Sequence, residues 1–212
     1  YLHEKYKLVT IIISPLIALM YDQVLGLEKK GIDIACYINS DIPLNRKEEI
    51  IEQIKNGEKS LIYLSPEMLL SYDIRSFIGE RKIGLIAVDE AHLVTTWGRD
   101  FRVDYWYLGT YLSKTRKYLD YHFPIIALTA TAVYQGEDDI VFDTIDSLNM
   151  INPKIYLGNV TRKEIKFKIN EFHFDGSHSV AKMVKTMEFI ASTVQEKNKA
   201  IVYFPFTTQV DE

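Results

Sequence analysis

The fold is decided by residues 83–92, which read Ile83-Gly84-Leu85-Ile86-Ala87-Val88-Asp89-Glu90-Ala91-His92. The first six residues form a short apolar run, which is typical of a strand buried on both faces of a parallel sheet. Two adjacent carboxylates, Asp89 and Glu90, follow this run directly. Because ligands bind at the carboxyl ends of the strands in open parallel sheets, the stretch predicts a buried strand with a polar site at its tip.

Apolar runs alternate with amphipathic stretches on both sides of this segment. We expect further strands over the ranges Val9–Ile13, Ile34–Ile38, Ser60–Leu64, Ile125–Leu128 and Lys154–Leu157. Helical spacing and capping residues predict helices from Ser14-Pro15 to Gly31, from Asp41 to Gly57, from Ser65-Pro66 onward, around Tyr105–Leu112, and from about Gln135 to Leu148. This strict alternation predicts an α/β fold with a doubly wound parallel sheet.

The composition changes after about Gly158. Residues 159–179 are polar and rich in basic side chains, which favours a linker. An apolar helical stripe from Val180 to Val194 and a strand-like run at Ala200–Phe204 follow. We therefore expect a first domain over residues 1–158, a linker over 159–179, and the start of a second α/β domain over 180–212. Because the chain begins with Tyr1 and ends soon after an expected strand, we interpret it as part of a longer protein.

Composition excludes several classes of protein. A single cysteine, Cys36, excludes an intramolecular disulfide framework and a four-cysteine zinc site. The sequence contains no run of about 18 apolar residues, so we expect no membrane-spanning helix. The 25 Lys and Arg residues against 29 Asp and Glu residues give a net charge of -4. Any contact with nucleic acid must therefore come from a local surface rather than from a global basic field.

The carboxylate pair is of the Walker B type. Because side chains alternate along a strand, Asp89 can reach a Mg²⁺ ion through water while Glu90 points to an attacking water. Phosphoryl transfer requires little more from a protein than such positioning and charge neutralisation. For the Asp-Glu pair alone, a pair of solvated acids is an equal alternative; His92, two residues further on, favours the functional interpretation.

Two further segments accompany this pair. Thr129-Ala130-Thr131-Ala132 follows an expected strand, and its small hydroxyl side chains can pack beside Asp89–His92. Trp97-Gly98-Arg99-Asp100-Phe101-Arg102 follows the carboxylates in the chain. Aromatic faces stack on unpaired bases and arginines pair with phosphates, although the same side chains could fill the core and form salt bridges.

Phosphate groups could be bound at two helix starts but not at a phosphate-binding loop. Ser14-Pro15 and Ser65-Pro66 place free N–H groups at strand ends, although each is also simply a good helix start. A phosphate-binding loop requires G-x-x-x-x-G-K-[ST]. The glycine pairs with this spacing, Gly26 with Gly31 and Gly79 with Gly84, are not followed by lysine.

Together these segments resemble the motifs of superfamily two helicases and, among them, the RecQ-like DEAH-box DNA helicases. The resemblance runs from about Val9 to Phe167, while motif I would precede Tyr1. Thr96, Arg99 and Tyr21 depart from the residues usual in the family. The resemblance is carried by Ile13–Met20 with Asp22–Val24 (motif Ia), Asn39-Ser40, Tyr63–Glu67 (motif Ib), Asp89–His92 (motif II), Ala127–Ala132 (motif III) and the aromatic-rich loop Trp97–Arg102.

The resemblance implies ATP and Mg²⁺ as cofactors, and single-stranded or partly duplex DNA as the partner of a cytoplasmic protein with no membrane contact. It implies Asp89 as the Mg²⁺ contact through water and Glu90 as the base that orients water. His92, Thr129 and Thr131 would couple the nucleotide state to the grip on DNA. The implied DNA contacts are Ser14, Pro15, Ser40, Ser65, Trp97, Phe101 and Arg102.

These implications predict an ATP-dependent DNA helicase that moves 3′ to 5′. The chain alone is expected to be inactive, because the phosphate-binding lysine and the arginine finger are missing from it. One alternative is a DNA-stimulated ATPase that translocates without separating strands. Another is a nucleic-acid-binding module that has lost ATPase activity.

Overall fold

The computed structural model describes residues 1–95, 103–131, 133–135, 139–158, 169, 171 and 178–195. The chain divides into two compact units, Tyr1–Val160 and Thr161–Glu212. In the second unit, helix α9 spans His178–Gln195 and confirms the expected apolar helix. The run Ala200–Phe204 lies outside the described residues. Whether these units are motor domains joined by a linker stays a prediction.

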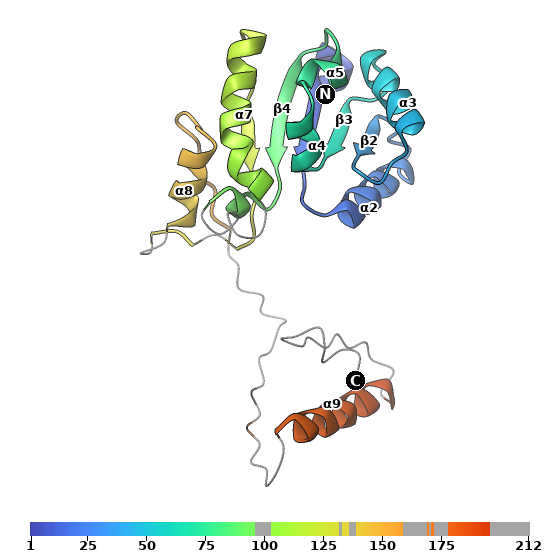
Figure 1. Ribbon diagram of the computed structural model, residues 1–212, viewed down its shortest axis with the longest axis vertical. Coiled ribbons are helices and arrows are strands. Elements are labelled where there is room, and N and C mark those ends of the chain that lie inside the picture. The colour runs from blue at the N-terminus through green and yellow to red at the C-terminus, as the bar shows by residue number, and fades with distance from the viewer. Residues whose placement is uncertain are drawn as a thin grey trace. The chain divides into compact units, whose positions relative to one another are not determined.

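The first unit is built on a five-stranded parallel sheet in the order β2-β3-β1-β4-β5 (Figure 1). Its strands are β1 Val9–Ile13, β2 Ala35–Ile38, β3 Leu61–Leu64, β4 Ile83–Val88 and β5 Ile125–Ala127. Each central strand is an apolar run, and parallel strands buried on both faces require that composition. The structure confirms the expected doubly wound α/β fold.

The helices connect successive strands and cover both faces of the sheet. Helices α3, α4, α5 and α7 contribute to the larger core cluster, whose strand residues include Ile11 and Ile13 of β1. Helix α2 packs on the opposite face against Tyr63, with Ile12 alongside. The bounds are α1 Leu2–Tyr6, α2 Ile17–Glu28, α3 Leu44–Lys55, α4 Pro66–Ser71, α5 Ile74–Ile78, the 3₁₀ helix η1 Ala91–Val94, α7 Val103–Leu119 and α8 Ile140–Ser147.

Several expected boundaries were wrong. Helix α2 begins at Ile17 rather than at Ser14-Pro15, α3 at Leu44 rather than Asp41, and α8 at Ile140 rather than Gln135. Residues 154–157 form no strand in the described structure, where Tyr156 is 84% exposed and has no sheet partner to bury it. The described residues include no helix with the length and apolarity needed to cross a bilayer.

Strand register decides where the polar residues lie. Ile38 is paired with Leu64, Leu64 with Ile13, Ile13 with Val88, and Val88 with Ala127. The last residues of all five strands are therefore level with one another. The residues that come next form one row along the carboxyl edge of the sheet: Asn39, Ser65, Ser14, Asp89 and Leu128.

Candidate functional site

The carboxyl edge brings the expected motif segments together. Backbone hydrogen bonds continue one residue beyond the strands, from Ser14 N–H to the Leu64 carbonyl at 3.1 Å and from Asp89 N–H to the Ile13 carbonyl at 2.8 Å. The Leu128 N–H donates to the Val88 carbonyl at 2.9 Å. The residues that follow β3, β1, β4 and β5 are therefore neighbours in space although they are far apart in the sequence.

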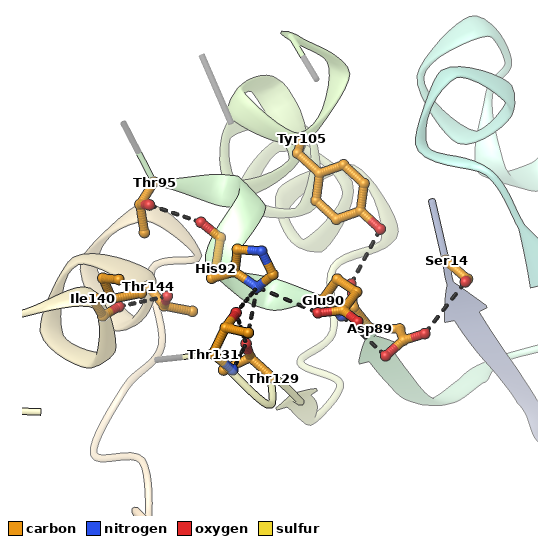
Figure 2. Close-up of polar contacts among 10 residues, drawn as sticks. All are labelled: Ser14, Asp89, Glu90, His92, Thr95, Tyr105, Thr129, Thr131, Ile140 and Thr144. Atoms are coloured by element: carbon orange, nitrogen blue, oxygen red, sulfur yellow. Dashed lines mark hydrogen bonds and ion pairs between the residues drawn. The ribbon is translucent and has the colours of Figure 1, made fainter. Parts of the chain in front are cut away.

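The Asp89 carboxylate is held at both oxygens (Figure 2). The Ser14 hydroxyl donates to Oδ2 at 3.3 Å, and the backbone N–H of Glu90 donates to Oδ1 at 3.0 Å. Ser14 is only 2% exposed, so its hydroxyl faces this carboxylate rather than solvent. Two donors on one carboxylate restrict its rotation, which is what a positioned metal contact requires.

Glu90 adopts the left-handed backbone conformation, with φ 48° and ψ 45°. For a residue with a Cβ atom this conformation costs about 1–2 kcal/mol, and it persists only where the surroundings enforce it. Immediately after Glu90, the Ala91 N–H donates to the Leu128 carbonyl at 2.9 Å, and η1 begins. The backbone therefore turns sharply between the two acids and the histidine.

The His92 imidazole links this turn to the end of β5. Its Nδ1 atom lies 2.9 Å from the Thr129 hydroxyl, 3.1 Å from the Thr131 hydroxyl and 3.4 Å from Glu90 Oε2 (Figure 2). One ring nitrogen cannot bond to all three partners at full strength, so a small movement exchanges one for another. The arrangement lets a displacement of Glu90 reach the loop that follows β5.

Two hydrogen bonds that the sequence analysis missed hold the backbone of the acidic segment. The Tyr105 hydroxyl, from α7, donates to the Asp89 carbonyl at 3.1 Å. The Thr95 hydroxyl donates to the His92 carbonyl at 2.7 Å. Helical spacing placed Tyr105 only in an expected helix; the one available signal was a tyrosine, rather than a phenylalanine, at a position that proves fully buried.

The residues expected to contact DNA differ from one another in exposure. Ser40 is exposed, whereas Ser14, Pro15 and Ser65 are buried. Trp97, Phe101 and Arg102 lie outside the described residues. Their assignment to a DNA track stays a prediction.

The chemistry of the donor set fits Mg²⁺ bound together with a nucleotide. Among the described residues, no group of three or more His, Cys, Asp or Glu side chains could hold a metal ion by itself. Mg²⁺ usually takes one or two carboxylates and completes its shell with water and phosphate oxygens. Asp89 offers such a carboxylate, and Glu90, whose side chain is 38% exposed, offers a second beside it.

Comparisons with known proteins agree with the expected family and the fold. The model of the DEAD/DEAH box helicase family matches residues 2–140. The ATP-dependent DNA helicase RecQ of Pasteurella multocida is 36% identical over 162 residues, which cover 76% of this chain and 24% of that protein. Its Haemophilus influenzae counterpart is 37% identical over 162 residues, with 76% and 25% covered. The expected resemblance to RecQ-like helicases is thereby confirmed.

A solved structure supports the fold. A crystal structure of the DUF1998 helicase MrfA bound to DNA and AMPPNP is similar with a TM-score of 0.68 and 15% identity. The match covers 99% of this chain and 29% of that one. The chain spans about a quarter of the length of the two RecQ relatives.

Proposed function

This chain belongs to the DEAD/DEAH box helicase family, and on that premise we propose that it forms part of the motor of an ATP-dependent, RecQ-like DNA helicase. One observation carries the proposal. The Asp89-Glu90-Ala91-His92 segment ends a central strand, and its histidine contacts Thr129 and Thr131 at the end of the neighbouring strand. A site that couples ATP hydrolysis to a movement elsewhere needs both the acidic pair and a contact that connects this pair to another loop.

In this proposal the acids divide the work of hydrolysis. Asp89, fixed by Ser14, would hold Mg²⁺ through water, and Glu90 would orient the attacking water and accept its proton. Bound Mg²⁺ would neutralise charge on the phosphate oxygens. His92 would link the position of the Glu90 side chain to Thr129 and Thr131. Its Nδ1 atom lies 3.4 Å from the Glu90 carboxylate and 2.9 and 3.1 Å from the two threonine hydroxyls.

The remaining parts of the motor are proposed to come from outside the chain. The sequence has no G-x-x-x-x-G-K-[ST] segment, and we propose that other residues of the parent protein supply the phosphate-binding lysine. Residues 1–158 would be most of the first motor domain, 159–179 a linker and 180–212 the entry to the second domain. The isolated chain should therefore have no measurable ATPase activity.

DNA is the proposed substrate, and the parent is proposed to move along it 3′ to 5′ in the cytoplasm. The relatives are named as DNA helicases, which supports DNA over RNA. Trp97, Phe101 and Arg102 would bind the single strand, because aromatic faces stack on unpaired bases. Ser40, which is exposed at the carboxyl edge, would lie beside the same strand.

Glu90→Ala in the full-length parent tests the proposal. We expect ATP hydrolysis in the presence of single-stranded DNA to fall by at least about 1,000-fold, because the water loses its orienting base, while DNA affinity stays unchanged. Glu48→Ala is the matched control, since Glu48 is an exposed glutamate on α3. Turnover that survives Glu90→Ala would contradict the assigned role.

The same preparation separates the other functions. Hydrolysis that DNA stimulates, without strand displacement, would identify a translocase rather than a helicase. No hydrolysis by the unaltered parent would identify a nucleic-acid-binding module. Loss of DNA stimulation in Trp97→Ala, with basal hydrolysis kept, would support the proposed single-strand contact.

A further inference from the structure

The peptide unit that joins Asp89 to Glu90 is fixed at both of its polar atoms. Its carbonyl oxygen accepts the Tyr105 hydroxyl at 3.1 Å, and its N–H donates to the Asp89 carboxylate at 3.0 Å. The next peptide unit is fixed as well, because the Ala91 N–H donates to the Leu128 carbonyl. Glu90 therefore lies between two peptide units whose orientations are set by other parts of the fold.

This fixation explains how Glu90 keeps its left-handed backbone. The angle φ of 48° is set by the orientation of the preceding peptide unit relative to the Cα–Cβ bond. A glutamate relaxes out of this conformation unless something prevents that peptide unit from rotating. The Tyr105 hydroxyl is well placed to do so, since it approaches from a different element and from a fully buried ring.

Tyr105 also occupies a special place in the chain. It is the third residue of α7, and α7 follows directly after residues 96–102, the segment proposed to bind single-stranded DNA. On the other side of that segment, the Thr95 hydroxyl donates to the His92 carbonyl. Thr95 and Tyr105, which lie on either side of the segment in the sequence, therefore both donate hydrogen bonds to the backbone of residues 89–92, as Figure 2 shows.

We propose that Tyr105 is a positioning residue for Glu90. Its hydroxyl holds the Asp89–Glu90 peptide unit in the orientation that directs the Glu90 carboxylate at the attacking water. This inference rests on the proposed function, because it assumes that Glu90 orients water.

Tyr105→Phe in the full-length parent tests the inference, because it removes one oxygen and keeps the ring. Tyr111→Phe is a matched control: Tyr111 lies on the same helix, and its hydroxyl donates to the Tyr72 backbone carbonyl at the same 3.1 Å. We expect kcat for DNA-stimulated ATP hydrolysis to fall about ten-fold in Tyr105→Phe, with KM for ATP within about two-fold, because misplacement of a catalytic group lowers kcat. Tyr111→Phe should keep both values.

Equal kinetics for the two variants would overturn the inference while leaving the proposed function intact. A rise in KM at constant kcat would also overturn it, since that pattern reports ground-state binding. Failure of Tyr105→Phe to fold would count against it too, because the hydroxyl would then be structural. An unaltered parent without ATPase activity would instead remove the proposed function itself.

A second measurement needs no catalysis. Glycine adopts the left-handed conformation without steric cost. Glu90→Gly should therefore raise the midpoint temperature of the first thermal unfolding transition of the parent by about 2–4 °C. If Tyr105 holds Glu90 in this conformation, Tyr105→Phe lets residue 90 relax, and the same glycine substitution then raises the temperature less. The full gain should persist beside Tyr111→Phe. An equal gain in all three backgrounds would show that Tyr105 does not act through Glu90.

Discussion

Strand β3 lies between two buried serines whose surroundings differ. Ser60 precedes the strand and Ser65 follows it, and they are 2% and 1% exposed. The Ser60 hydroxyl oxygen accepts from Arg81 at 2.6 Å and lies 2.7 Å from His3 Nδ1. Within the part of the chain that the structure describes, the Ser65 hydroxyl has no hydrogen-bond partner. At the amino end of β3 the serine hydroxyl is satisfied, and at the carboxyl end it has no partner among the described residues.

The amino edge is closed around one guanidinium. Arg81 donates to the carbonyls of Ile54 at 2.5 Å, Lys59 at 2.7 Å and Lys7 at 3.2 Å, in addition to Ser60. These carbonyls belong to the last turn of α3 and to the residues just before β3 and β1. Partial burial lowers the pKa of Arg81 from its ordinary value, but three carbonyls and a hydroxyl compensate the half-buried charge.

The carboxyl edge at β3 and β4 leaves bonding capacity unused instead. His92 Nδ1 has three competing partners, and the Ser65 hydroxyl has none among the described residues. Proteins break local rules of this kind mainly where a ligand binds or a group must move. The difference teaches that this fold gains stability at one edge of its sheet and keeps the other available for chemistry.

The largest expected effect comes from opening the amino edge. Arg81→Met should lower the free energy of unfolding by about 2–3 kcal/mol, because the part-buried Ile54 and Lys59 carbonyls and the buried Ser60 hydroxyl lose the guanidinium as a donor. Urea unfolding of the chain measures the change. Arg46→Met is the control: Arg46 forms an exposed ion pair with Glu49, and its loss should change stability by no more than about 0.5 kcal/mol. Equal losses would contradict the special role of the amino edge.

The two serines give a smaller and more direct comparison. Ser60→Ala should lower the free energy of unfolding by about 1–2 kcal/mol, because the side chains of Arg81 and His3 lose a partner. Ser65→Ala removes a buried hydroxyl that has no partner among the described residues, so it should be neutral or stabilising by up to about 1 kcal/mol. Urea unfolding under identical conditions compares them. A larger loss for Ser65→Ala would reverse the comparison.

The sequence predicted the strands well where burial alone decides them. Val9–Ile13 and Ile83–Val88 are confirmed residue for residue, because apolar runs flanked by polar residues have sharp ends. Helix starts were predicted less well, because Ser14 and Asp41 are residue types that often cap helices but form other hydrogen bonds here. The Ser14 hydroxyl bonds to Asp89, and the Asp41 N–H donates to the Asn39 side chain in a turn that precedes α3.

The candidate site could be predicted only in part for a related reason. Motif spacing placed Asp89, His92 and Thr129 at strand ends, and register then brought them together. The contact of Tyr105 with Asp89 joins residues 16 positions apart through the start of α7. A helical stripe shows that a side chain is buried, but not which backbone group its hydroxyl reaches.

The smallest expected effect is a pH dependence at the amino edge. Burial, together with the positive charges of Lys7 and Arg81, lowers the pKa of His3 from its ordinary value of 6.5, although Glu4 opposes this. The hydrogen bonds agree with a neutral ring: since Arg81 donates to the Ser60 oxygen, the Ser60 hydroxyl can donate to Nδ1 of an unprotonated His3. Protonation of Nδ1 would remove that acceptor.

The sign of the pH dependence follows from this lowered pKa. The unfolded chain binds a proton at His3 more readily than the folded chain does, so the contribution of His3 to stability is complete above pH 6.5 and falls as the pH drops below it. Urea midpoints at pH 7.5 and pH 5.5 should therefore differ less in His3→Asn than in the unaltered chain. His122→Asn, at an exposed position before β5, should retain the original difference. If His3→Asn retained it as well, the His3 ring would not be part of the closed amino edge, and the contrast between Ser60 and Ser65 would rest on Arg81 alone.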